Sequence, residues 1–297
     1  MEFLVLFAKT IALRPYVFVF LVVFLFASVT SMGLIRTMVF WLGTWLIAFL
    51  SEFSSTRTGF PYGWYQYTES TRGQELFVFN IPFMDSLSYS FLLFASFSLS
   101  LYTLAPLYGK GMTFRIADTF KIRQSWKVLI LTALYMMMID VVIDPVALQG
   151  EKWFLGKIYY YEYQGYYFGV PLSNALGWGI VGFVATAVYQ TIEKRFLSHS
   201  FQDRGMRAIP FQGFWGVGLY YGVLAFNLGV TAYIEAWGLL IAGVFIYLLP
   251  TTILVFRYFD KKSQATRDEW QSHLDEFPPV LKNKVISNTG AKINATR

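Results

Sequence analysis

Carboxyl groups stand in the same place in two matching stretches of this sequence, each at the end of an apolar segment. The first stretch starts at Glu52 and runs through an aromatic- and glycine-rich loop to a segment that Pro82 opens. The second starts at Asp140 and Asp144 and runs through a tyrosine-rich loop to a segment that Pro171 opens. Acids in apolar segments are costly to keep there, so their recurrence favours a chemical role.

These side chains suit acid catalysis on an apolar substrate. A carboxyl group in an apolar pocket favours its neutral form, because desolvation penalises the anion, and it can then donate a proton. The loops carry tyrosine and tryptophan, whose ring faces attract cations and could stabilise a carbocation without trapping it. Together these groups suit protonation of an alkene, followed by water capture or ring closure, with no cofactor or metal required.

The two stretches align residue by residue, which indicates an internal repeat with copies at about 37–105 and 126–192. The aligned pairs are Phe79 with Phe168, Pro82 with Pro171, Asp85 with Asn174, Leu87 with Leu176, and Tyr89 with Trp178. If both copies cross a membrane in the same sense, their loops can meet and build one site.

The composition predicts an all-α, polytopic integral membrane helical bundle. Of 297 residues, 56% are hydrophobic and only 14% are charged, and the mean hydropathy is +0.46. A membrane-spanning helix needs roughly 20 apolar residues. Seven windows approach or exceed this length, at about 16–35, 37–53, 82–105, 126–146, 170–192, 211–232 and 236–256. We therefore expect a transmembrane domain over 1–259 and a polar tail over 260–297.

Lysine and arginine set the expected orientation, because short cytoplasmic loops collect these residues. They cluster after the third window, after the fifth and at the start of the tail: Lys110, Arg115, Lys121, Arg123, Lys127, Lys194, Arg195, Arg204, Arg207, Arg257, Lys261 and Lys262. The C-terminus is then cytoplasmic. Both repeat loops fall on the non-cytoplasmic side of the cell membrane, and the repeat is parallel.

The sequence also excludes several classes of site. It has no cysteine, and its two histidines, His199 and His273, lie in polar segments, which removes thiolate and histidine-rich di-iron sites. The net charge of +6 fits a membrane protein beside anionic lipid, and no surface suits nucleic acid. Gly177, Gly179 and Gly182 form a G-x-G-x-x-G pattern inside an apolar window, where helix packing explains them better than dinucleotide binding.

The acids at the ends of the windows have structural interpretations as well. Asp140 and Asp144 lie on one helical face, where they could cap the helix end or pair with a lysine of the next loop. We expect Pro145 to end that helix. Glu52 could pair with Arg57 at the membrane interface.

The remaining polar and aromatic candidates also have structural interpretations that compete with a chemical role. Asp85 and Asn174 each follow a proline by three residues, where a side chain can accept hydrogen bonds from free backbone N–H groups. Tyrosine and tryptophan collect at membrane interfaces without any catalytic duty. Asn227, isolated in the sixth window, favours packing.

Three segments resemble a known family. They are 57–68 (RTGFPYGWYQYT), 140–145 (DVVIDP) and 166–178 (YYFGVPLSNALGW). They resemble the membrane carotenoid hydratase family, whose members include bisanhydrobacterioruberin hydratase and the related carotenoid 1,2-hydratases; the resemblance covers mainly residues 41–182. It implies water addition across the terminal carbon–carbon double bond of an acyclic carotenoid, which gives a tertiary alcohol.

Residues and resemblance together give a mechanistic hypothesis. A protonated Asp144 or Asp140 delivers a proton to the less substituted alkene carbon, and the partner acid or Glu52 deprotonates the attacking water. The expected substrate-pocket residues are Tyr65, Tyr67, Tyr167 and Trp178 around the cation, with Asn174 and Asp85 holding water or bracing the loops. The expected partners are an acyclic carotenoid, water and membrane lipid.

Two alternatives remain open at this point. A carotenoid cyclase would use the same acid and cation but close a ring when water is excluded. A non-enzymatic carotenoid-binding or carrier protein would use the acids as structural or coupling groups.

Overall fold

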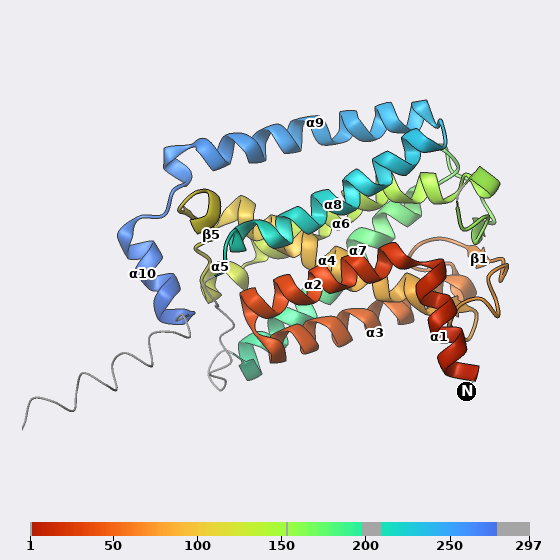
Figure 1. The fold of residues 1–297 in the computed structure, drawn as a ribbon, viewed down its shortest axis with the longest axis horizontal. Helices are drawn as coiled ribbons and strands as arrows, with labels where there is room; N and C mark the ends of the chain where they lie inside the picture. Colours follow the sequence, from red (N-terminus) through yellow and green to blue (C-terminus); the bar gives the residue numbers. More distant parts are fainter. Residues whose placement is uncertain (1, 153, 198–208, 278–297) are drawn as a thin grey trace, which may run out of the picture.

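Seven long apolar helices make up most of the structure, a computed structural model that describes residues 2–152, 154–197 and 209–277. They are α2 (Pro15–Met32), α3 (Leu34–Thr58), α4 (Phe83–Leu104), α6 (Trp126–Ala147), α7 (Leu172–Ile192), α8 (Gln212–Tyr233) and α9 (Trp237–Phe259). They lie side by side in one bundle (Figure 1). The predicted membrane bundle and its seven windows are confirmed. His199, Arg204, Arg207 and residues 278–297 of the tail lie outside the described residues.

Shorter elements lie at the two ends of the bundle. The helices are α1 (Glu2–Leu13), α5 (Phe120–Arg123) and α10 (Arg267–Glu276), with single turns at Gly111–Thr113, Gly150–Lys152, Glu193–Leu197 and Lys261–Ser263. The strands are β1 (Tyr65–Tyr67), β2 (Phe77–Val78), β3 (Ile81–Pro82), β4 (Leu107–Tyr108), β5 (Arg115–Ile116) and β6 (Tyr159–Tyr161). Below, the end that carries β1 is the loop end, and the end that carries α5 and α10 is the tail end (Figure 1).

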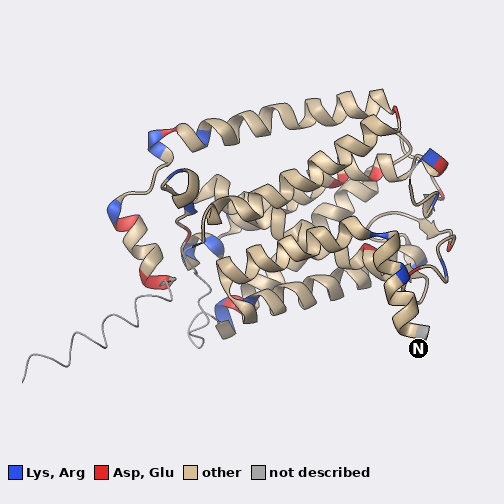
Figure 2. Cartoon of the chain, in the orientation of Figure 1, with Lys and Arg blue, Asp and Glu red and all other residues tan. Residues whose placement is uncertain are grey.

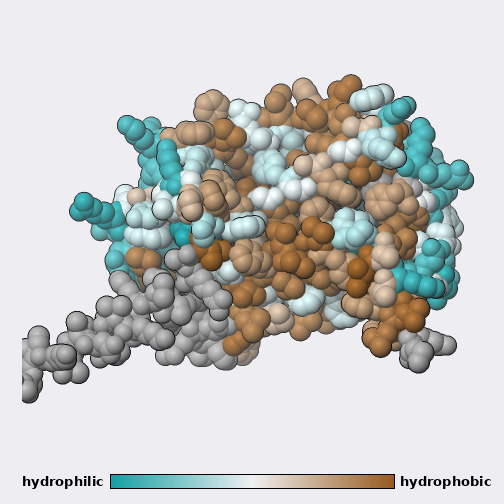
Figure 3. Space-filling model, viewed as in Figure 1, coloured by the Kyte–Doolittle hydropathy of each residue, from teal (hydrophilic) through white to brown (hydrophobic). Residues whose placement is uncertain are grey.

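The surface of the bundle matches a bilayer. Charged residues gather at the two ends (Figure 2), and a broad apolar belt separates them (Figure 3). The central helix is α4, with 83% of its apolar window buried against 22% for α9. Small side chains on α4, among them Ser90, Ser96 and Ser100, are fully buried. Small residues let neighbouring helices approach closely, which explains why this helix can occupy the centre.

The internal repeat is visible in the backbone. Phe79 and Phe168, which the sequence alignment pairs, both adopt positive φ angles, of 58° and 50°. Pro82 and Pro171 each stand immediately before the first residue of a helix, α4 and α7. Strand β1 of the first loop pairs with β6 of the second. The two loops therefore meet at the loop end, as the sequence allows for a parallel repeat.

The end of α6 differs from the prediction, because the helix continues two residues past Pro145 to Ala147. Proline removes its own N–H donor and crowds the turn before it, but it leaves the N–H groups of the following residues free to bond. The next turn keeps its bonds, since the backbone N–H of Leu148 donates to the carbonyl of Asp144 at 3.1 Å. The last turn of α6 thus holds Asp144 in helical geometry.

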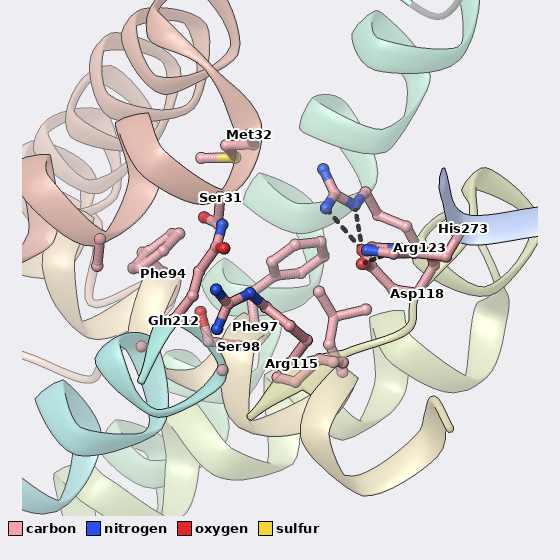
Figure 4. A pocket seen from close by; sticks show the side chains of 15 residues that line it. Ser31, Met32, Phe94, Phe97, Ser98, Arg115, Asp118, Arg123, Gln212 and His273 are labelled. Atoms are coloured by element: carbon pink, nitrogen blue, oxygen red, sulfur yellow. Dashed lines mark hydrogen bonds and ion pairs between the residues drawn. The ribbon is translucent and has the colours of Figure 1, made fainter. Parts of the chain in front are cut away.

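A cluster of buried charged residues lies at the tail end. Arg123 donates two hydrogen bonds to one carboxylate oxygen of Asp118, at 2.8 and 2.6 Å, and lies 3.5 Å from Glu193. His273, which α10 contributes, contacts the carbonyl of Asp118 at 2.6 Å (Figure 4). The ring of Trp270 on α10 stacks on Tyr108 at 3.8 Å. The polar segment after α9 is therefore packed against the bundle through residue 277.

Candidate active site

A cavity opens at the loop end between α2, α4, α6 and α8. It holds about 1070 Å³ of space that atoms do not fill, counting its open mouth. Apolar side chains of α2 and α8, including Val17, Phe20 and Val223, line it together with most of the candidate polar residues. Its lining, mostly apolar and aromatic with a few convergent polar groups, is that of a small-molecule site.

Asp144 is the carboxyl group with the most hydrogen-bond donors in this cavity. The hydroxyls of Tyr159 and Tyr161 donate to its two oxygens, the second at 2.7 Å. The side-chain amide of Asn174 donates to Asp144 at 3.1 Å and to Asp140 at 2.8 Å. Asp140 is 1% exposed, and its other oxygen has no partner among the described residues. One amide therefore bridges two buried carboxyl groups.

No cation lies on this pair of acids in the part of the chain that the structure describes. Lys157, one of the lysines of the following loop, lies over the ring of Tyr160 instead. Two negative charges that one amide bridges in a buried site repel each other. Since nothing neutralises them, such a pair favours holding a shared proton.

Four tyrosines of the two loops face the same cavity because of the strand register. Tyr65 pairs with Tyr161 and Tyr67 with Tyr159 in the antiparallel β1–β6 ladder. Side chains alternate along a strand, so these four share one face and Tyr160 takes the other, where it is exposed. Burial, reinforced by nearby carboxyl groups, raises the pKa of all four hydroxyls well above the usual range. They stay neutral and can donate hydrogen bonds.

Glu52 reaches the cavity from α3. One of its oxygens accepts a hydrogen bond from Ser86 on α4 at 2.7 Å, and Tyr67 interacts with the same carboxyl group. Arg57 is not its partner, because that side chain donates to Asn80 at 3.0 Å. Glu52 is therefore a buried acid without an ion pair among the described residues.

Asp85 has a different environment, which the sequence did not reveal. Arg14, just before α2, donates to Asp85 at 2.5 Å and to Glu75 at 2.8 Å. Thr71 donates to Glu75 at 2.6 Å. Arg14 and Glu75 are 2% and 1% exposed, whereas the side chain of Asp85 is 20% exposed and lines the cavity.

The structure brings most of the predicted site residues together. Those that line the cavity are Glu52, Tyr65, Tyr67, Asp85, Asp144, Asn174 and Trp178. Asp140 does not line it but reaches it through Asn174. Tyr167 does not line it, and its ring contacts Phe168. Asp85 and Asn174 do not cap their helices, because neither side chain bonds a free backbone N–H at the start of α4 or α7.

The lining residues that were not predicted as site residues include Arg14, Tyr159, Tyr161 and Asn227. The spacing of tyrosines in 65–67 and 159–161 was a usable signal, since two short strands with aromatics at alternate positions place them on one face. The buried amide oxygen of Asn227 has no partner among the described residues, which packing alone does not explain.

Gly177 lets α7 approach the first loop over the cavity. A methyl group there would lie 2.7 Å from the carbonyl oxygen of Pro61 and from the ring of Tyr62. We expect Gly177→Ala to displace this loop, lowering stability by about 1–3 kcal/mol and reducing activity. Gly179→Ala is the matched control, because its nearest neighbour would be 3.9 Å away on Met137. Thermal unfolding in detergent should separate the two variants; equal effects would contradict the packing role.

No group of three or more histidine, aspartate or glutamate side chains in the described ranges is arranged to hold a metal ion. The cavity offers carboxyl groups, phenol hydroxyls and aromatic faces. Tyr89 and Trp178, an aligned pair of the repeat, stack at 4.7 Å, and Trp178 borders the cavity. The arrangement can deliver a proton to an apolar molecule and surround a cation with ring faces.

Comparison with known proteins places the chain in one family. No curated protein and no solved structure matches the chain. A family model described as "carotenoid biosynthesis protein" matches residues 12–250, which is most of the chain and includes every residue of the cavity. The chain belongs to the carotenoid biosynthesis protein family.

Proposed function

We propose that the protein is a carotenoid hydratase, a hydro-lyase that adds water across the terminal double bond of an acyclic carotenoid. The observation that carries this proposal is the Asp140–Asp144 pair, bridged by Asn174 and facing an aromatic cavity through Asp144. Membership of a carotenoid biosynthesis family and the apolar belt support a lipid-dissolved polyene as the substrate. The residues of the site supply acid and cation stabilisation without a cofactor.

The first chemical step is protonation of the alkene from Asp144. As the proton leaves, negative charge develops on this carboxyl group, and three donors already point at it from Tyr159, Tyr161 and Asn174. Preorganised donors stabilise charge as it forms. The proton goes to the less substituted carbon, and the tertiary cation lies among the aromatic rings that line the cavity.

Water then attacks the tertiary cation and loses a proton to a carboxyl group of the site, which leaves a tertiary alcohol. The polyene lies between the helices and enters laterally from the lipid. Apolar lining from α2 and α8 supports this path, since Val17, Phe20 and Phe226 border the same cavity as the acids.

Expression in a lycopene-accumulating host tests the reaction class. We expect the extracted pigment to be heavier by one water for each end that reacts, because hydration adds the atoms of water and removes none. Mass spectrometry of the pigment measures this. An isomer of unchanged mass would instead indicate a carotenoid cyclase. Unchanged pigment that co-purifies with the protein would indicate a carotenoid-binding or carrier protein, and either result would overturn the hydratase.

We also propose an orientation in the cell membrane, with the loop end non-cytoplasmic and the C-terminus cytoplasmic. The basic residues Lys121 and Arg123 lie at the tail end with α10, whereas both repeat loops lie at the other end. Short cytoplasmic loops collect lysine and arginine, which favours this sense of insertion.

A further inference from the structure

The cavity contains acids in two opposite electrostatic environments. Asp140 and Asp144 have only neutral donors around them, from tyrosines and an amide. Asp85 instead contacts a guanidinium at 2.5 Å. Burial without a cation favours the protonated form of an acid, whereas an adjacent cation favours its anion. One cavity therefore presents a proton donor and a carboxylate.

The group around Asp85 carries a net negative charge. Arg14 contributes one positive charge, and Glu75 and Asp85 each contribute a negative one. Glu75 is buried, is hydrogen-bonded by Thr71 and does not line the cavity, so Asp85 is the acid of the group that faces the cavity. Uptake of one proton by Asp85 makes the buried group neutral, which burial favours.

Glu52 is a weaker candidate for a base. It is 8% exposed, its hydrogen bond comes from Ser86, and it has no cation among the described residues. A carboxyl group buried in this way favours its protonated form, and a protonated acid has no capacity to accept the proton of water.

We propose that Asp85 is the base that accepts the proton of the attacking water, with Arg14 and Glu75 as positioning residues: the cation of Arg14 favours the anion of Asp85, and the negative charge of Glu75 favours proton uptake by that anion. This assignment rests on the proposed hydratase function. Water oxygen forms the new bond to the tertiary carbon, and one of its O–H bonds breaks. That proton passes to Asp85, while the carbon-bound hydrogen comes from the Asp140–Asp144 pair.

The cycle closes when the proton returns from Asp85 to the Asp140–Asp144 pair. Tyr67 interacts with Asp85, and its ring lies 6.3 Å from that of Tyr159, which donates to Asp144. The tyrosine face of β1 and β6 therefore lies between the base and the acid, and we place the return of the proton along it. With that return no net proton is gained or lost.

The assignment of the Asp140–Asp144 pair as the acid and Asp85 as the base is tested by turnover of lycopene in D₂O, with membranes that contain the full chain. A cation that water does not capture loses a hydrogen from an adjacent carbon and returns to the alkene with deuterium attached. We expect Asp85→Asn to lower the amount of hydrated product by at least about 100-fold while recovered lycopene still gains deuterium. Wild-type protein should give hydrated product that carries carbon-bound deuterium. Mass spectrometry reads both quantities in one sample.

Two further variants test the group around Asp85. Glu75→Gln keeps an acceptor for Arg14 and Thr71 but removes the negative charge that favours proton uptake by Asp85. The amount of hydrated product should therefore fall, though less than in Asp85→Asn, and deuterium incorporation should be retained. Arg14→Gln should also separate hydration from deuterium incorporation, and it provides the same readout if Asp85→Asn does not accumulate. Glu151→Gln, an exposed acid at the loop end, is the control for a mere change of charge.

Three outcomes would overturn the assignment. Normal hydration in Asp85→Asn would remove Asp85 as the base and leave the hydratase function intact. Loss of both hydration and deuterium incorporation in folded Asp85→Asn protein would show that Asp85 does not act at the water step. If Glu52→Gln lost hydrated product but kept deuterium incorporation, and Asp85→Asn changed neither, Glu52 would be the base instead of Asp85. Absence of hydrated product from wild-type protein would refute the hydratase function itself.

Discussion

Replacing Asp144 with asparagine is expected to lower the yield of hydrated carotenoid by about 10²–10⁴-fold, the range that general acid catalysis supplies. Asparagine matches aspartate in shape: its amide oxygen can accept a hydrogen bond from one of Tyr159 and Tyr161, and its NH2 group can donate one to the hydroxyl of the other. It has no acidic proton to give the alkene. The measurement is the ratio of hydrated to unreacted pigment in a lycopene-accumulating host, corrected for the amount of protein in the membrane.

The Asp144→Asn variant should also fail to incorporate deuterium into recovered lycopene, because no cation forms. This result distinguishes loss of the acid from loss of the base at Asp85. Glu151→Gln again serves as the control, since that acid is exposed and does not line the cavity. Unchanged turnover in folded Asp144→Asn protein would remove Asp144 from the mechanism.

The bundle and the repeat were predictable because their signals are local. A run of apolar residues long enough to cross a bilayer has few alternatives to a helix, since no water can satisfy its backbone groups. The prolines at 82 and 171 mark the same point in each copy, immediately before a helix, and Phe79 and Phe168 share an unusual φ angle. Matching local sequence produced matching local backbone.

The environment of each acid was not predictable, because it depends on contacts between distant residues. Arg14 meets Glu75 and Asp85 across 61 and 71 residues of sequence. The sequence could place Asp85 in the first turn of a helix but could not show which charge would lie against it. The pairing of the two short strands also depends on distant residues, and it decides which tyrosines face the cavity. Tyr159 lines the cavity because it lies opposite Tyr67, whereas Tyr167 lies outside the paired strands and does not line it.

Replacing Arg123 with methionine is expected to destabilise the protein by about 3–5 kcal/mol, because it removes the guanidinium that Asp118 and Glu193 share and leaves Arg36 as the arginine beside Glu193. The tail end carries none of the proposed chemistry, so the loss should appear in the free energy of unfolding rather than in the kind of product formed. Thermal unfolding in detergent measures it. Arg72→Met is the matched control: Arg72 also pairs with an acid, Glu69, but both side chains are about half exposed, and water replaces the lost contact. Equal stability of the Arg123 and Arg72 variants would contradict the view that the buried cluster holds α10 and the tail-end loops against the bundle.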